Sequence, residues 1–432
     1  MSAAIVDTPA SPGDVGPGTV IRTRSFKAPI ILGATALASL LIFGMLTPTG
    51  IRTEFVVATS SDFVQLPSLT VAARLAAVSL SVVALLLAGW SAYLAKDFRK
   101  PGIWLPIVYG MAVMGALLTW AGAGRDATTI QLTGLLTSSL FLAVPLVFGA
   151  LAGTVCERSG IINIAIEGQL LAGAFLAALV ASMVGNVYVG LIAAPIAGAL
   201  VGLLLAIFST RYWVNQIVVG VVLNMLVIGL TSFFFSTVMS DNPGLNQSTG
   251  VQKIGIPLLE SIPVLGPVLF NHNLLVYIMY VVVIVLQIML FKSRWGLRVR
   301  AVGEHPKAAD TVGIKVNRTR VRNTMLGGAI AGLGGAFFTV ASGLAFGKEM
   351  TAGKGYIALA AMILGRWSPR GALAAALLFG FADALRVQLG IIGSDIPSQF
   401  LAMTPYLATI FAVAGLVGRS RPPAAEGIPY KK

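Results

Sequence analysis

The chain has 432 residues, of which 56% are hydrophobic and only 11% carry a charge. A soluble domain carries about 25% charged residues, so this composition excludes a soluble protein and indicates a membrane protein. The net charge of +14 does not require nucleic acid, because cations gathered in the loops on one side of a membrane explain it. A single cysteine excludes an internal disulfide, and two isolated histidines give no zinc-site pattern.

The first 28 residues are polar and rich in proline, glycine and serine, which is typical of a disordered segment. Basic residues then precede an apolar run at 29–47, as they do in a signal peptide. The triplet Ala36-Leu37-Ala38 imitates a cleavage site, but it falls in the middle of the run. We therefore predict a disordered cytoplasmic N-terminus, residues 1–28, followed by a retained first span.

Apolar runs that are long enough to cross a bilayer recur along the whole chain. They lie near 29–49, 71–95, 103–123, 132–155, 163–184, 187–208, 214–237, 274–291, 323–346, 371–390 and 401–418. The run 356–365 is too short to span alone, so we expect a half-helix or re-entrant segment there. These runs predict an all-α fold, a polytopic transmembrane helical bundle.

The distribution of charge predicts the orientation. If the N-terminus lies inside and each run crosses, including 356–365, the cytoplasmic parts hold 23 Lys or Arg and the outside loops hold 5, with 7 Asp or Glu on each side. Lys and Arg are retained in cytoplasmic loops, so we expect both termini to be cytoplasmic. Residues 419–432 are then a basic cytoplasmic tail. The long outside interval 238–273 is either a structured segment on which a partner docks or a simple connector.

The loop 292–322 is the most basic interval, with nine Lys or Arg against Glu304 and Asp310. Within it, Pro306 at a first helical turn and a stop at Gly313 predict one short helix of about two turns. A short helix that a membrane protein presents to the cytoplasm is a surface that a partner protein could bind and displace.

Ionisable residues inside a bilayer are costly, so each needs a reason. Asp383 and Arg386 are spaced i, i+3 on one predicted helix and can neutralise each other, which favours a structural role. Arg74 lies in the first turn of its run and can extend to the membrane interface.

Glu167 follows Asn163 by four residues, and on a helix the two would share a face, with Gly160 and Gly168 as break points. Two interpretations remain open. The carboxyl lines a cavity at a discontinuous helix, or it binds neighbouring backbone and fixes the break without touching substrate.

The run 214–237 carries a polar stripe that includes Asn224, with Gln216 somewhat off it. Helix–helix hydrogen bonding is the favoured role, and lining of a polar path is the alternative. The candidate residues of a translocation path are therefore Asn163, Glu167, Gln216 and Asn224. Residues 198–202 and 328–332 each have the small-xxx-small spacing that lets helix backbones approach closely in lipid.

No phosphate-binding loop or hydrolase motif is present in the sequence. Any energy that this protein uses must therefore come from an ion gradient or from another subunit. If the source is an ion gradient, the protein is a secondary transporter with Glu167 or Asp383 as its proton site. This is the alternative to a protein that is driven by another subunit.

The segment 157–168, ERSGIINIAIEG, closely resembles the signature of permease subunits from bacterial ABC importers. The family is that of branched-chain amino acid, ribose and nucleoside permeases, and the Glu-Gly ending of the segment resembles the nucleoside branch. Three further stretches, 214–224, 297–316 and 360–367, fit the same family, so the resemblance covers about 132–418 in the expected order.

The resemblance implies a type II ABC importer-like permease core at 132–418, preceded by three extra spans within 29–131. It implies a bacterial cell-membrane importer of nucleosides, with sugars or branched-chain amino acids as alternative solutes. The implied partners are a separate ATPase pair, a second homologous permease and an extracytoplasmic substrate-binding lipoprotein. No cofactor is expected on this chain, since ATP and magnesium would bind the ATPase.

The resemblance also implies that residues 303–313 form a coupling helix seated in a groove of the ATPase. We expect its small and apolar residues to dock there, with Glu304 and nearby arginines setting the orientation. The predicted coupling residues are Glu304, Pro306, Ala308, Ala309, Val312 and Gly313.

Overall fold

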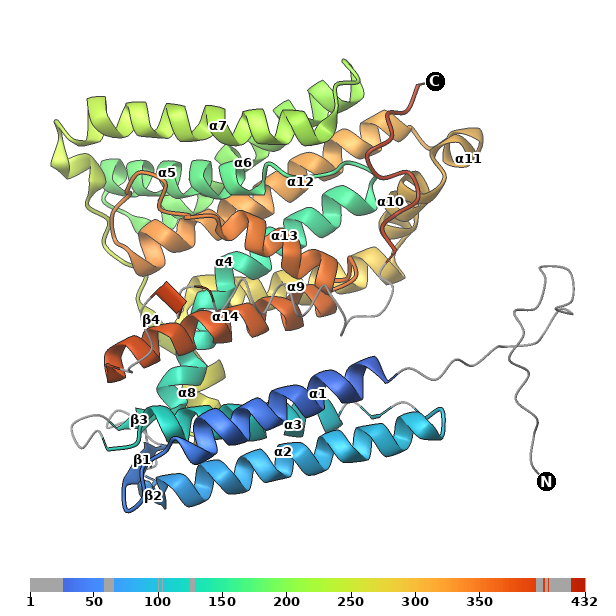
Figure 1. Cartoon of the computed structure of the whole chain (residues 1–432). Helices are drawn as coiled ribbons and strands as arrows, with labels where there is room; N and C mark the ends of the chain where they lie inside the picture. The colour runs from blue at the N-terminus through green and yellow to red at the C-terminus, as the bar shows by residue number, and fades with distance from the viewer. Residues whose placement is uncertain are drawn as a thin grey trace, which may run out of the picture. The chain divides into compact units, whose positions relative to one another are not determined.

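The computed structural model describes residues 26–57, 66–99, 101, 102, 104–124, 129–393, 399, 400, 403 and 421–431. Among these residues, ten helices are long and apolar enough to cross a membrane. The predicted helical bundle is therefore confirmed (Figure 1). The predicted span 401–418 and almost all of the predicted disordered segment 1–28 lie outside the described residues.

The ten long elements correspond in order to the first ten predicted spans. They are α1 (Lys27–Ser39) with η1 (Leu40–Met45), α2 (Ala73–Lys96), α3 (Trp104–Ala121), α4 (Leu132–Arg158), α5 (Ile166–Val184), α6 (Val187–Thr210), α7 (Gln216–Phe234) with η2 (Phe235–Met239), α9 (Leu274–Lys292), α12 (Val316–Ala336) with η4 (Phe337–Ser342), and α14 (Pro369–Ile392). The short helices are η3 (Pro243–Asn246), α8 (Leu265–Leu269), α10 (Arg294–Glu304), α11 (Pro306–Thr311) and α13 (Lys354–Leu364).

In the described part of the chain, five short strands lie outside the spans. They are β1 (Arg52–Val56), β2 (Leu69–Ala72), β3 (Ile130–Gln131), β4 (Lys253–Gly255) and β5 (Asn271–Asn273). β1 pairs in parallel with β3, with Phe55 opposite Ile130. β4 pairs antiparallel with β5, with Ile254 opposite His272. With η3, β4, β5 and α8, the interval 238–273 contains regular secondary structure.

The chain divides into two compact units, one formed by residues 1–53 and 71–124 and the other by residues 54–70 and 125–432. In the first unit, α2 packs against both α1 and α3. Small and polar side chains meet inside this unit: the Ser39 and Ser81 hydroxyls are 2.9 Å apart, and the Tyr109 hydroxyl donates to the Leu32 carbonyl at 2.7 Å. Large apolar residues such as Leu75 remain exposed, as expected for helices that face lipid.

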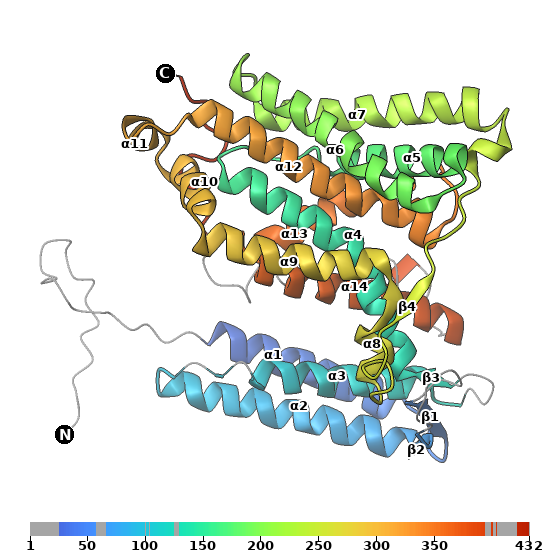
Figure 2. The ribbon, with the colours of Figure 1, turned by 180° about the vertical axis from the view of Figure 1, so that it is seen from behind.

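In the second unit, α4 and α12 are the most enclosed of the described spans, with 72% of the residues in the most apolar stretch of each buried. Figures 1 and 2 show α6, α12, α4 and α14 following one another across this unit. The two small-xxx-small motifs meet where α6 crosses α12. A Cβ added to Gly198 would lie 2.1 Å from the Gly328 carbonyl oxygen, so this approach requires glycine. The predicted close packing is confirmed, and the structure pairs the two motifs with each other.

The run 356–365 forms α13, an 11-residue helix between α12 and α14. At 1.5 Å per residue it is about 16 Å long, roughly half the hydrocarbon thickness of a bilayer. The prediction of a helix too short to span alone is therefore confirmed.

Candidate translocation path and coupling surface

The segment between α4 and α5 is not helical, so the chain breaks at residues 159–165. Gly160 lies at φ +93°, a left-handed backbone conformation that favours glycine. The segment that contains Asn163 is not helical, so Asn163 and Glu167 do not share a helical face: Asn163 belongs to this break and Glu167 to the first turn of α5. Gly168 lies inside α5 and does not break it.

Asn224 of α7 fastens this break from one side. Its side-chain nitrogen donates to the Ile164 carbonyl at 2.9 Å, and its side-chain oxygen accepts from the Gly168 nitrogen at 2.8 Å. A third contact joins it to the Tyr356 hydroxyl on α13, at 3.2 Å. Asn224 is 2% exposed, so these bonds replace those that water would make. Part of the polar stripe on α7 thus packs against protein, as the favoured interpretation predicted.

Gln216 and Asn163 are also bonded within the break. The Gln216 side-chain oxygen accepts from the Ile162 nitrogen at 2.7 Å, while its side-chain nitrogen is buried with no hydrogen-bond partner among the described residues. The Asn163 and Gln169 amides exchange two hydrogen bonds, of 3.0 and 3.2 Å. Gln216 therefore holds the backbone of the break, whereas Asn163 ties the break to the first turn of α5 through Gln169.

The Glu167 carboxylate accepts three hydrogen bonds from the segment that opens α13. The donors are the Thr351 hydroxyl at 2.6 Å, the Gly353 nitrogen at 2.8 Å and the Gly355 nitrogen at 2.6 Å. The first nitrogens of a helix lack helical partners and carry partial positive charge, so a carboxylate is favourable there. Of the two interpretations of Glu167, this geometry favours the one in which it fixes the backbone.

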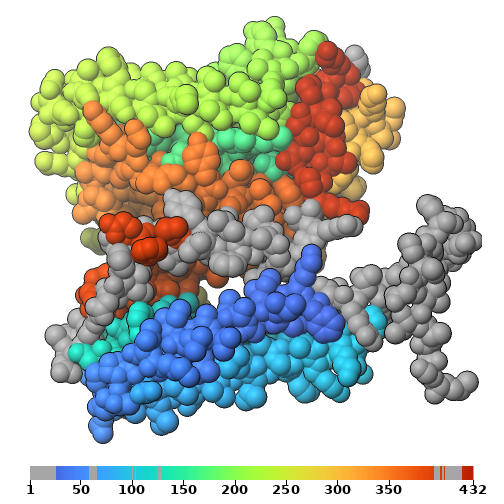
Figure 3. Space-filling view, viewed as in Figure 1, coloured from blue at the N-terminus to red at the C-terminus, as the bar shows by residue number. Residues whose placement is uncertain are grey.

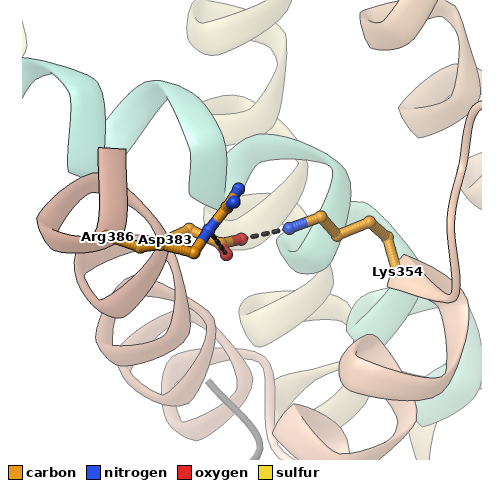
Figure 4. Close-up of polar contacts among 3 residues, drawn as sticks. All are labelled: Lys354, Asp383 and Arg386. Atoms are coloured by element: carbon orange, nitrogen blue, oxygen red, sulfur yellow. Dashed lines mark hydrogen bonds and ion pairs between the residues drawn. The ribbon is translucent and has the colours of Figure 1, made fainter. Parts of the chain in front are cut away.

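A second charged contact joins α13 to α14 (Figure 4). Lys354, at the start of α13, forms an ion pair with Asp383 of α14. Arg386 lies 3.9 Å from the other oxygen of Asp383, and its side chain is 43% exposed. The predicted Asp383–Arg386 pair is present, but Lys354 is the closer partner. The sequence did not indicate Lys354 as a partner of Asp383, because the two residues are 29 positions apart on different helices.

The far end of α13 is tied to the end of α4. Trp367 donates its indole N–H to the Glu157 carboxylate at 2.5 Å, and the Arg158 guanidinium donates to the Trp367 carbonyl at 2.9 Å. The half-helix is thus held at both ends by the signature segment, at Glu167 and at Glu157. Sequence reasoning had assigned Glu157 no role, and the only available signal was its place in that segment.

The predicted short helix in the basic loop is α11, which begins at Pro306 and ends at Thr311. Gly313 lies at φ +84°, where the chain turns toward α12. Val312 is 74% exposed and Ala308 is also exposed. Ala309 was predicted to dock against a partner, but it is 3% exposed and packs inside the chain.

A basic groove of about 730 Å³ lies beside this surface, between α10 and the start of α12. Five cations line it: Arg294, Arg298, Lys315, Arg318 and Arg322. Leu297 and Val312 add exposed apolar side chains to the same groove. An acidic surface with a few apolar residues would complement it.

The C-terminal residues 421–431 pack against the second unit, although the sequence predicted only a basic tail. Figure 3 shows them in dark red between the α7 side and the α10–α11 side of this face. The buried Arg320 guanidinium donates to the Ile428 carbonyl at 2.8 Å and to the Ala425 carbonyl at 3.4 Å. The Ala424 nitrogen donates to the Glu304 carboxylate at 3.1 Å, so the predicted orienting residue Glu304 binds the chain's own C-terminal segment.

Comparison with known proteins gives one family and several relatives. Residues 135–417 match the family described as branched-chain amino acid transport system / permease component. The chain is 39% identical to the guanosine ABC transporter permease protein NupQ of Bacillus subtilis (strain 168), over 68% of this chain and 95% of that protein. It is 36% identical to the nucleoside ABC transporter permease protein NupC of Lactococcus lactis subsp. cremoris, over 70% and 98%.

A more distant similarity is to the putative glucose ABC transporter permease protein TsgC13 of Haloferax volcanii, at 29% identity over 66% of this chain and 92% of that protein. No solved structure matches the chain.

Proposed function

We propose, on the premise that this chain belongs to the permease-component family of branched-chain amino acid transport systems, that its solute is a nucleoside. As a member of that family it is the non-catalytic membrane permease of an ABC importer, which works with ATPase and binding-protein partners. The observation that carries the nucleoside proposal is the 39% and 36% identity to permeases named for guanosine and nucleosides. A sugar is the second candidate, since a putative glucose permease is 29% identical.

The proposed path runs beside the break at 159–165 and the N-terminal end of α13. Its residues are Asn163, Glu167, Gln216 and Asn224. Non-helical backbone at membrane depth occurs where it is buried in protein or lines a polar cavity, and broken helices often adjoin the solute site of transporters. The support here is that polar side chains from α5 and α7 meet the start of a half-helix at this break. A shift of α13 would release the three bonds to Glu167 and free its carboxylate.

The proposed coupling surface is α11 with the turn that follows it. Ala308 and Val312 would dock on the ATPase, while Pro306 and Gly313 set where the helix begins and ends. Closure of the ATPase pair around ATP and magnesium would push α11 and change the side to which the path opens. The chain itself would hold no cofactor. A second homologous permease and an extracytoplasmic binding lipoprotein would complete the importer.

The proposed orientation places both termini in the cytoplasm of a bacterial cell. The excess of 23 Lys or Arg over 5 supports it. The contact between the Ala425 nitrogen and the Gly303 carbonyl, at 2.9 Å, adds that residues 421–431 lie on the same side as the basic loop.

Uptake of radiolabelled guanosine tests the solute. We expect a strain that lacks nucleoside uptake to recover it when the chain is expressed with its ATPase, companion permease and binding protein. Labelled glucose in the same strain tests the second candidate. Accumulation of guanosine by the purified chain alone in liposomes, on a pH gradient without an ATPase, would instead favour the secondary transporter.

Two substitutions test the coupling surface. Ala308→Asp and Val312→Asp place a charge on the exposed docking residues, and we expect uptake to fall about tenfold or more. Ala308→Ser is the matched control, because it keeps the side chain small and uncharged. If a chain that carries both Ala308→Asp and Val312→Asp supported wild-type uptake, α11 would not be part of the coupling mechanism.

A further inference from the structure

Residues 421–431, here called the C-terminal clasp, touch the elements that the coupling mechanism must connect. The Ala425 nitrogen donates to the Gly303 carbonyl at 2.9 Å, just before α11. The Gly427 nitrogen donates to the Gly160 carbonyl at 3.3 Å, inside the break between α4 and α5. The clasp therefore bridges the coupling loop and the signature segment through its own backbone.

Tyr430 anchors α11 directly. Its ring is buried against Ala309, together with Val302 and Val316. Its hydroxyl forms a hydrogen bond with the carboxylate of Asp310, also in α11. One clasp side chain thus holds two adjacent residues of the same short helix. The burial of Ala309, unexpected from the sequence, is explained by this contact.

Arg320 of α12 holds the middle of the clasp. It is 1% exposed, and its two terminal nitrogens donate to the carbonyls of Ala425 and Ile428. A buried cation is costly unless it is well bonded, so the clasp carbonyls stabilise Arg320 where it lies. A Cβ at Gly160 would lie 2.7 Å from Arg320, so the break is shaped around the same guanidinium.

The end of the clasp reaches a further element. The Lys431 ammonium lies 4.4 Å from the centre of the Trp213 ring, in the connection between α6 and α7. This distance is within the range of a cation–π contact. The clasp consequently joins the coupling loop, α12, the break and the α6–α7 connection.

A six-residue helix cannot hold its place alone, because helices much shorter than about 12 residues are marginal in water without tertiary contacts. To transmit force, α11 needs a fixed position relative to the membrane helices. We propose that the C-terminal clasp supplies this position, with Tyr430 and Arg320 as positioning residues that couple α11 to the break at 159–165. This inference rests on the proposed coupling role of α11.

The test uses the assembled importer in liposomes and measures guanosine uptake together with ATP hydrolysis. For Tyr430→Ala and for a chain ending at residue 420, we expect the uptake per ATP hydrolysed to fall at least fivefold. Tyr430→Phe keeps the ring and loses only the hydroxyl contact, so its uptake per ATP hydrolysed should fall by less than twofold. The control is Arg421→Gln, an exposed clasp residue, and it should keep the wild-type ratio.

A wild-type ratio of uptake to ATP hydrolysis in Tyr430→Ala would overturn the inference. This includes the case in which uptake and ATP hydrolysis both fall by the same factor, since the clasp would then not contribute to coupling. The Val312→Asp variant, run in parallel, separates the two proposals. If Val312→Asp transports normally, the proposed coupling role of α11 is wrong. If Val312→Asp is uncoupled while Tyr430→Ala is not, the coupling role of α11 stands and only the role of the clasp is wrong.

A second measurement does not depend on the solute or on the truncated chain. A nitroxide attached at Ala308→Cys reports the motion of α11, and the native Cys156 is buried and so protected from the label. We expect Tyr430→Ala to shift the spectrum toward faster motion and Arg421→Gln to leave it unchanged. An unchanged spectrum in Tyr430→Ala would contradict the clasp as the anchor of α11.

Discussion

The Glu167 carboxylate of α5 accepts a 2.6 Å hydrogen bond from the backbone nitrogen of Gly355, 188 residues further along the chain. The two residues fit only because Gly355 has no side chain, as a Cβ there would lie 2.5 Å from the Glu167 backbone. The start of the half-helix α13 is therefore placed by a glutamate on one element and a glycine on another. This contact sets the geometry of the proposed path.

Removing the Glu167 carboxylate should loosen α13. Glu167→Ala leaves three donors without their acceptor in a buried site, which costs about 1–3 kcal/mol for each group that water does not reach. We expect a lower unfolding temperature of the purified chain in detergent and loss of uptake. Asp241→Asn, at an exposed acidic residue, is the control and should change neither. Unchanged stability of Glu167→Ala would show that these bonds are not needed.

The Lys354–Asp383 pair should matter more than the Asp383–Arg386 pair. Lys354→Met removes the closer partner and leaves the buried Asp383 carboxylate with only the more distant Arg386. Because the Lys354 side chain is partly exposed, we expect a cost of about 3 kcal/mol, at the lower end for a buried pair. Arg386→Gln should cost less than about 1 kcal/mol, because Arg386 is distant and exposed. Denaturant unfolding of each variant checks the order. Equal costs would mean that Asp383 has no preferred partner.

The crossing of α6 and α12 should not tolerate a methyl group. In Gly198→Ala the new Cβ would meet the Gly328 carbonyl at 2.1 Å, so the two helices must move apart, at a cost of about 3 kcal/mol. Gly229→Ala is the matched control, since nothing lies within 4 Å of a Cβ there and alanine favours a helix. Thermal unfolding in detergent compares them. Equal stability of the two variants would refute this packing.

Docking of the clasp should weaken as the pH rises. Burial raises the pKa of Glu426, although a hydrogen bond with Glu157 and the positive charge of Arg158 lower it in part. A raised carboxyl pKa means that the docked state favours the neutral acid. The stabilisation of the docked clasp by neutral Glu426 is complete below the ordinary glutamate pKa of about 4.3, and it is lost as the pH rises through the raised pKa.

A nitroxide at the exposed position Ile428→Cys can follow this titration, and we expect its motion to increase over that pH interval. Glu426→Gln cannot ionise, so its spectrum should show no such step. A step of the same size in Glu426→Gln would assign the titration to another group.

Much of the architecture could be predicted from local sequence. Ten spans, the half-helix at 354–364 and the short helix after Pro306 all appear as apolar runs or helix-end signals. The partners of the candidate residues could not be predicted. Glu167 meets residues near 353, Lys354 meets Asp383, and Ala309 meets Tyr430, and each pair is joined only by the way the chain returns on itself.

The sequence by itself determined the membrane class, the number and order of most spans, and the resemblance to ABC importer permeases. Those properties depend on hydropathy, charge and a contiguous signature, all of which are local. Only the tertiary structure decided that 159–165 is a break, that Glu167 binds the start of α13, and that the C-terminal residues pack onto the coupling loop. The reason is that buried polar groups must find partners, and here those partners come from elements far away in the chain.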